Sequence, residues 1–212
     1  MSKNTLYIVV EGVVGTGKST QVKKIHKWLT KKYPKKEIII TREPGGTEIA
    51  EEIRRVVQGT KYNESMDYIC EAYLYASARS QSLRKIFKEK PTKETVVISD
   101  RSFLTSVANQ GEGRKVGIDN VLEINKKAIE GFIPDIVLYL DLDIKVGLSR
   151  AFDHGGDKFE SLGIDFYKRV QKGYKKIQKT KGYFNHWINI DARGTQEEVF
   201  HKIKKSLEKL IR

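Results

Sequence analysis

The sequence has little cysteine and no long apolar run, and both scarcities exclude whole classes of protein. Its 212 residues include one cysteine, Cys70, which excludes an internal disulfide framework and fits a reducing, cytoplasmic setting. We expect Cys70 to be a small buried residue on a helix. No segment approaches the roughly 18 consecutive apolar residues of a membrane span. The first residues, MSKNTLYIVVEG, lead directly into a strand pattern and leave no room for a secretory signal.

Acidic residues are also in the minority. The chain has 40 Lys and Arg against 27 Asp and Glu, a net charge of +13, and such proteins can bind nucleic acid, anionic membranes or polyanionic small molecules. Much of the excess lies in the helical segments 23–36 and 168–181, without zinc-ligand spacing or an aromatic RNA-binding signature. We therefore expect solvated helix faces, no membrane and no nucleic acid partner. A non-catalytic nucleotide-binding or nucleic-acid-binding protein stays open as an alternative.

Short apolar segments and helical patterns alternate along the chain. Strands are predicted at 6–10, 37–41, 95–99, 135–140 and 186–190, as apolar runs typical of strands buried on both faces. Helical apolar stripes lie at 22–29, 69–87, 162–177 and 199–210. This alternation predicts one α/β domain over residues 1–212, with a five-stranded parallel sheet between two helix layers. Segment 152–163, rich in glycine and acids, is predicted to be a mobile loop between two helices.

The segment that follows the first strand fits the phosphate-loop pattern G-x4-G-K-[ST]. Its glycines allow successive backbone N–H groups to face one anion, its lysine reaches the β- and γ-phosphates, and its serine hydroxyl ligates Mg²⁺. The pattern predicts a nucleoside triphosphate site with magnesium, formed by Gly12, Val13, Val14, Gly15, Thr16, Gly17, Lys18, Ser19 and Thr20.

Two further polar motifs stand at the ends of the second and third predicted strands. TREPGGTE (41–48) contains a forced turn, with Thr47 as an N-cap candidate for the next helix. SDRS (99–102) places Asp100 and Arg101 where parallel sheets bind ligands. Asp100 could hold the magnesium or its water and Arg101 a phosphate. A surface ion pair is the alternative for these two residues.

Together these residues resemble the thymidylate kinases, a family of P-loop nucleoside monophosphate kinases. The resemblance rests on residues 11–20, TREPGGT (41–47), YLYASAR (73–79), DRSFLTSVANQGEGR (100–114), PDIVLYLD (134–141) and NIDARGTQEEV (189–199). It implies the three-layer P-loop kinase fold, Mg²⁺ with ATP, a homodimer, and transfer of the ATP γ-phosphoryl group to dTMP in dTTP biosynthesis.

The resemblance also implies the residues that bind the acceptor dTMP. Tyr75 would stack on the thymine and Arg79 would hold its carbonyl, four residues apart on one helix face. Tyr75 as a core residue, and Arg54 as an exposed helix residue, stay open. The full implied set is Glu11, Arg42, Pro44, Arg54, Tyr75, Arg79, Arg101, Thr105, Ser106, Asn109 and Gln110.

On the ATP side, the resemblance implies that segment 152–163 closes as a lid. Arg150, Ala192 and Arg193 would contact ATP. The cations around the transferred phosphoryl group, and hence the implied catalytic residues, would be Lys18, Arg101, Arg150 and Lys158.

Three positions depart from the family pattern. Val14 stands where an acid is usual near the acceptor sugar, and Asn109 replaces an aromatic residue that lines the sugar. Lys158 stands where many members have a lid arginine. Members without a lid arginine usually have an arginine in the phosphate loop, but that position is Gly15 here. The first two changes predict weaker recognition of the acceptor sugar, so a kinase of another deoxynucleoside monophosphate stays open.

Overall fold

The structure is a computed structural model that describes residues 5–59, 61–88, 94–152 and 162–211. Its strands are β1 (Thr5–Glu11), β2 (Glu37–Arg42), β3 (Thr95–Asp100), β4 (Ile136–Asp141) and β5 (His186–Asp191). Its helices are α1 (Lys18–Lys32), α2 (Glu48–Gln58), α3 (Tyr68–Lys88), α4 (Phe103–Ser106), the π-helical η1 (Val107–Gly113), α5 (Ile118–Ile129), α6 (Ile144–Phe152), α7 (Gly163–Ile177) and α8 (Gln196–Leu207).

The five strands form one sheet in the order β2-β3-β1-β4-β5, and every neighbouring pair is parallel. This confirms the predicted five-stranded parallel sheet and all five strand positions. The central strand, β1, is almost wholly buried, whereas the edge strands β2 and β5 are partly exposed. Full burial is therefore a wrong expectation for the two edge strands, since the outer edge of each has no strand beside it.

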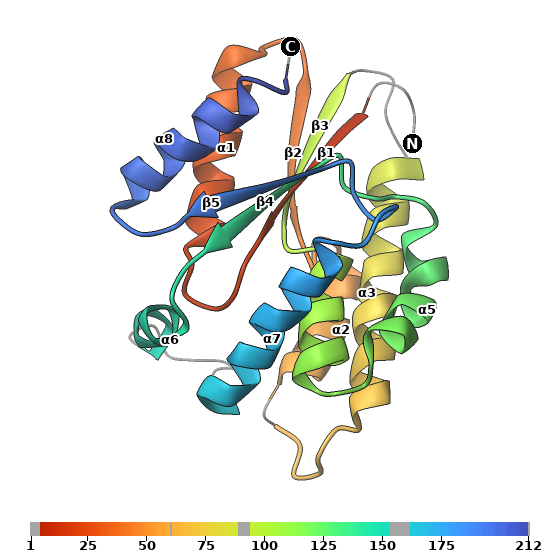
Figure 1. Cartoon of the computed structure of the whole chain (residues 1–212). Coiled ribbons are helices and arrows are strands. Elements are labelled where there is room, and N and C mark those ends of the chain that lie inside the picture. Colours follow the sequence, from red (N-terminus) through yellow and green to blue (C-terminus); the bar gives the residue numbers. More distant parts are fainter. Residues whose placement is uncertain (1–4, 60, 89–93, 153–161, 212) are drawn as a thin grey trace.

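Helices cover both faces of the sheet, as Figure 1 shows. Alternate residues of β1 point to opposite faces: Ile8 packs in a cluster with Ile25 of α1 and Ile203 of α8. Val9 packs on the other face, with residues of α3, α5 and α7. Because α1 and α8 lie on one face and the remaining long helices on the other (Figure 1), the predicted three-layer arrangement is confirmed.

Helix α3 buries the predicted stripe only in part: Ala72 and Leu83 are buried, but two residues near the start of the helix are not. Ile69 is 43% exposed and Tyr73 59% exposed, although both were assigned to the buried face. Cys70 is also exposed, so the expectation of a buried cysteine was wrong. The reason is that α3 buries polar side chains, including Glu71 and Arg79, which an apolar pattern does not register.

The carboxyl ends of parallel strands lie at one edge of the sheet, where such folds bind ligands. Here the loops after β1, β2 and β3 carry the three polar motifs of the sequence to that edge. Residues 153–161, most of the predicted lid and including Lys158, lie outside the described residues. In the described part of the chain, no helix has the combination of length and apolarity needed to cross a membrane.

Candidate functional site

An open cleft of about 1220 Å³ lies at this edge of the sheet. The phosphate loop, the residues after β2 and the residues after β3 all contribute to its wall. Predicted site residues in its lining are Val13, Val14, Gly15, Gly17, Lys18, Ser19, Thr20, Arg42, Pro44, Arg54, Tyr75, Asp100, Arg101, Thr105, Asn109 and Arg150. The structure therefore brings most of the residues singled out from the sequence into a single cleft.

The phosphate loop joins β1 to α1 in a conformation that depends on glycine. Gly17, the residue before α1, has a φ of 83°, in the left-handed region that glycine adopts without strain. Lys18 follows and is buried, and its ammonium donates to the Val13 carbonyl at 2.7 Å and to the Thr16 hydroxyl at 3.3 Å. The lysine is thus folded over the loop, at the positive end of α1, where anions bind favourably.

Ser19 and Asp100 meet across this loop. The Ser19 hydroxyl donates to the Asp100 carboxylate, although 81 residues separate them in the sequence. β1 and β3 are adjacent and in register, and Val10 pairs with Asp100, which brings the two strand ends together. A hydroxyl and a carboxylate oxygen are thereby presented side by side in the cleft lining.

Arg101 is held in an unusual backbone conformation beside the loop. Its φ is 73°, which is uncommon for a residue with a side chain, and its N–H donates to the Val10 carbonyl at 3.0 Å. Its guanidinium donates to the Gly12 carbonyl at 3.3 Å and to the Thr105 hydroxyl at 3.4 Å. These contacts turn the guanidinium toward the cleft between the phosphate loop and α4.

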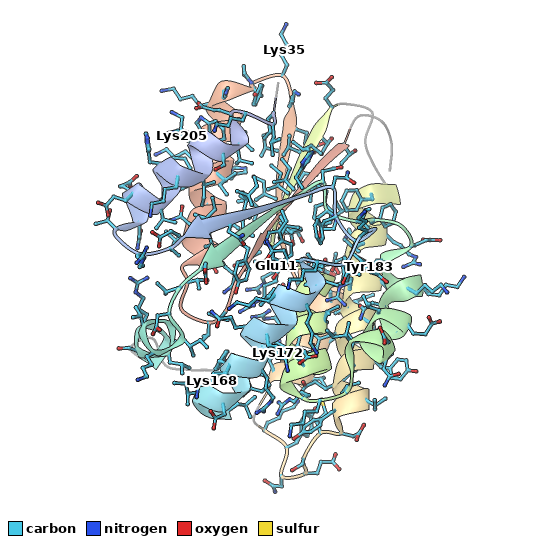
Figure 2. The ribbon with its side chains drawn as sticks, in the orientation of Figure 1. Glu11, Lys35, Lys168, Lys172, Tyr183 and Lys205 are labelled. Carbon is cyan, nitrogen blue, oxygen red and sulfur yellow. The ribbon has the colours of Figure 1, made fainter. Side chains whose placement is uncertain are left out.

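Glu11 forms a buried anchor behind Arg101. Its carboxylate accepts hydrogen bonds from Ser102 and Thr105 at 2.6 Å and from Tyr174 at 2.9 Å. Figure 2 shows Glu11 in the interior, and Lys35 and Lys205 at the periphery. Burial raises the pKa of Glu11, although the three hydroxyl donors and Arg101 favour its ionised form. Glu11 was predicted to bind the acceptor, but it does not line the cleft and instead orders residues that do.

Two aromatic side chains contribute to the cleft wall. Tyr75 lines the cleft, and its hydroxyl accepts a hydrogen bond from Gln58 at 3.1 Å. Tyr167 of α7 lines the same cleft and lies among the same apolar cluster as Tyr75. Gln58 and Tyr167 were not singled out from the sequence. Tyr167 follows directly on Phe166 of the predicted helix stripe, but no local pattern indicated that it faces a ligand.

Arg79 is placed differently from its predicted role. It is 1% exposed, it does not line the cleft, and it forms an ion pair with Glu43. It also donates to Asn125 and to the Ser106 hydroxyl, the latter at 3.0 Å. The guanidinium therefore lies behind Glu43, which lines the cleft. In this geometry Arg79 does not reach the cleft, and its contact with the base stays a prediction.

Several other predicted residues do not line the cleft. Gln110 is buried, donates to Glu71 at 3.0 Å, and has a carbonyl oxygen without a partner in the described part of the chain. Arg193 is exposed and paired with Asp191. The remaining predicted residues outside the lining are Gly12, Thr16, Ser106 and Ala192.

On the side where ATP contacts were predicted, the cleft is lined by the loop after β5 and by α6. The lining includes Gly194, Thr195 and Gln196, which follow directly on the predicted Ala192 and Arg193. Arg150, near the end of α6, also lines the cleft and is exposed. The predicted Ala192 and Arg193 therefore lie just before the lining residues of this loop, and their contact with ATP stays a prediction.

Comparisons with known proteins agree on one family. A family model described as Thymidylate kinase matches residues 10–203. The chain is 40% identical over 201 residues to a thymidylate kinase of Clostridium novyi, covering 93% of this chain and 96% of that protein. It is 36% identical over 207 residues to one of Caldicellulosiruptor saccharolyticus, covering 97% of each. The crystal structure of thymidylate kinase from Ehrlichia chaffeensis matches with a TM-score of 0.74 at 25% identity, over 96% of this chain and 99% of that one.

Proposed function

Because the chain belongs to the thymidylate kinase family, we propose that it transfers the γ-phosphoryl group of ATP to dTMP, giving ADP and dTDP. The observation that supports this most directly is the set of residues that line the cleft. The phosphate loop with Lys18 lines it, Arg101 lies beside this loop, and the aromatic side chains of Tyr75 and Tyr167 line it as well. Such a cleft offers cations to two phosphate groups and a flat apolar surface to a base. We also propose a cytoplasmic location, because the substrates are free nucleotides and a chain with one cysteine suits a reducing compartment.

The proposed mechanism relies on positioning and charge, because the acceptor is a phosphate that is already ionised near neutral pH. No residue is therefore needed as a general base. Lys18 would hold the β- and γ-phosphates against the loop, and Arg101 would hold the acceptor phosphate in line with them. Arg150, and Lys158 of the predicted lid, would approach from the other side of the transferred group. Closure over the cleft would exclude water, which competes as an acceptor.

The residues at the loop fit a magnesium ion. Mg²⁺ in such enzymes is held by one or two protein oxygens together with substrate phosphates and water. This agrees with the Ser19–Asp100 pair, and with the absence, among the described residues, of any group of three or more His, Cys, Asp or Glu that could hold a metal. We propose that Ser19 ligates the ion and that Asp100 holds it or its water. When bound, the ion neutralises charge on the β- and γ-phosphates.

The first prediction concerns the acceptor. With saturating ATP, dTMP should be turned over with a higher kcat/KM than CMP, AMP and GMP, measured by coupled detection of ADP. The aromatic side chains can stack on any base, so the expectation of thymine rests on the family. Equal or faster turnover of CMP, AMP or GMP would contradict the assignment to dTMP and favour the alternative kinase. ADP release without any acceptor measures background hydrolysis and serves as the control.

We further propose a homodimer. The exposed side chains of Ile69 and Tyr73 lie one turn apart on α3 and form an apolar strip that a second copy could cover. Sedimentation equilibrium should give about twice the chain mass of 24.3 kDa, and Tyr73→Glu should lower it to the monomer mass. Leu210→Glu, at an exposed apolar residue beyond α8, is the matched control. A monomeric wild-type protein would rule out the dimer.

A further inference from the structure

The phosphate loop and α6 touch through two glycines. A Cβ atom added to Gly15 would lie 1.9 Å from the carbonyl oxygen of Gly147 on α6. A Cβ atom added to Gly147 would lie 2.5 Å from the carbonyl oxygen of Val14. Since ordinary van der Waals contact begins at 3.4 Å, neither position has room for a side chain. The two backbones are therefore in direct contact.

Val14 strengthens this contact from the loop side. Its half-buried side chain packs against an apolar cluster that includes Ile144 and Leu148 of α6. An acid at this position would have to leave that cluster or be desolvated in it. The unusual valine in a polar loop is thus accounted for by packing, because it joins the same apolar cluster as two residues of α6.

Arg150 is carried by the same helix. It lies three residues after Gly147, so the two are on neighbouring turns of one side of α6. Gly147 touches the loop, and Arg150 lines the cleft. The depth at which α6 lies on the loop therefore determines how far the Arg150 guanidinium stands from phosphates bound by that loop. Asp143 fixes the start of the helix, where its carboxylate accepts from the N–H groups of Lys145 and Val146.

We propose that Gly147 is a positioning residue that sets the docking depth of α6 on the phosphate loop and so places Arg150 against the phosphates of ATP. This inference rests on the proposed phosphoryl transfer. It also accounts for Gly15, because an arginine at that position of the loop would collide with α6. The cation then has to come from the helix side of the cleft.

Gly147→Ala is the direct test. To bring the new Cβ from 2.5 Å to 3.4 Å from the Val14 oxygen, α6 must move by about 0.9 Å. A misplacement of that size can cost about a hundredfold in rate. We therefore expect kcat to fall by about a hundredfold, with little change in the KM for ATP. Because alanine favours a helix over glycine, loss of α6 itself is not the expected cause.

A double-mutant cycle separates positioning from general damage. If Gly147 acts through Arg150, then Gly147→Ala combined with Arg150→Ala should be no slower than Arg150→Ala alone. Effects on kcat that multiply would overturn the inference, as would an unimpaired Gly147→Ala variant. Ser149→Ala, at an exposed position of the same helix, should keep wild-type kcat.

A second variant covers the case in which Gly147→Ala does not fold, which thermal unfolding would reveal. Val14→Ala trims the apolar contact without adding bulk, and it should lower kcat by roughly tenfold in the presence of Arg150 but not in its absence. All assays use the monophosphate that the wild type turns over fastest, so a wrong acceptor changes only the substrate. If the wild type is active but the effects of the Gly147 and Arg150 substitutions on kcat multiply, this inference alone is refuted. If the wild type is inactive with every monophosphate, the proposed function is refuted as well.

Discussion

Lys18→Ala should abolish phosphoryl transfer, with a loss of kcat on the order of a thousandfold or more, the scale set by cations that stabilise the transferring group. Lys18 is 7% exposed and its ammonium is held over the loop by Val13 and Thr16, within the cleft lining. Bound β- and γ-phosphates would accept from the same ammonium. Without it, their charge is left uncompensated where the chain turns into α1.

The same variant should remain folded. Lys18 is the first residue of α1, where a positive charge is opposed by the helix dipole, so removing the charge costs the helix nothing. Coupled detection of ADP gives the rate, and circular dichroism gives the melting temperature. Lys18→Met, which keeps most of the stem, should be equally inactive. Lys27→Ala, at an exposed lysine of the same helix, should be unaffected. Near-normal turnover in either Lys18 variant would show that the loop does not perform the chemistry.

Arg79→Ala should be the most destabilising of the substitutions considered. The ion pair of Arg79 with Glu43 is buried, with side chains 1% and 2% exposed, and the guanidinium also donates to Asn125 and Ser106. Removing one partner of a buried pair leaves the other charge without compensation and typically costs about 3–5 kcal/mol. Burial already raises the pKa of Glu43, and without Arg79, which favours the ionised form, Glu43 should bind a proton more readily.

Urea unfolding of wild type and variant measures this loss. Arg55→Ala serves as the matched control, because Arg55 pairs with Glu52 at side chains 67% and 66% exposed, and such surface pairs are worth about 0–1 kcal/mol. A loss of free energy of unfolding no larger for Arg79→Ala than for Arg55→Ala would contradict the buried pair. Arg79 would then be available for the base, as the family resemblance implies.

The parts of the fold that could be predicted from the sequence are those with a local cause. The central strand was found because Ile8, Val9 and Val10 form an uninterrupted apolar run between Thr5 and Glu11. The phosphate loop was found because Gly17, Lys18 and the residues around them must be close in sequence to surround one anion. The N-cap of α2 was found for the same reason, and the Thr47 hydroxyl accepts from the Ala50 N–H at 3.3 Å.

Features that depend on distant partners could not be predicted. Arg79 has the residue type and spacing of a base contact, and only the packing of α3 shows that Glu43 already binds it. Glu71 is likewise buried and ion-paired with Arg114 of a distant segment, while the neighbouring Cys70 is exposed. The contact between Gly15 and Gly147 joins residues more than one hundred positions apart, and neither glycine carries a side chain whose type would indicate it.

The exposed position of Cys70 has a practical consequence. The chain has one thiol, and it is accessible on α3, beside the apolar strip of Ile69 and Tyr73. A maleimide fluorophore or spin label can therefore be attached at a single known site without any mutagenesis. In an assembled pair, that site would carry two probes beside the proposed contact. The rate of labelling and the coupling between the probes would then report directly on how the two copies associate and separate.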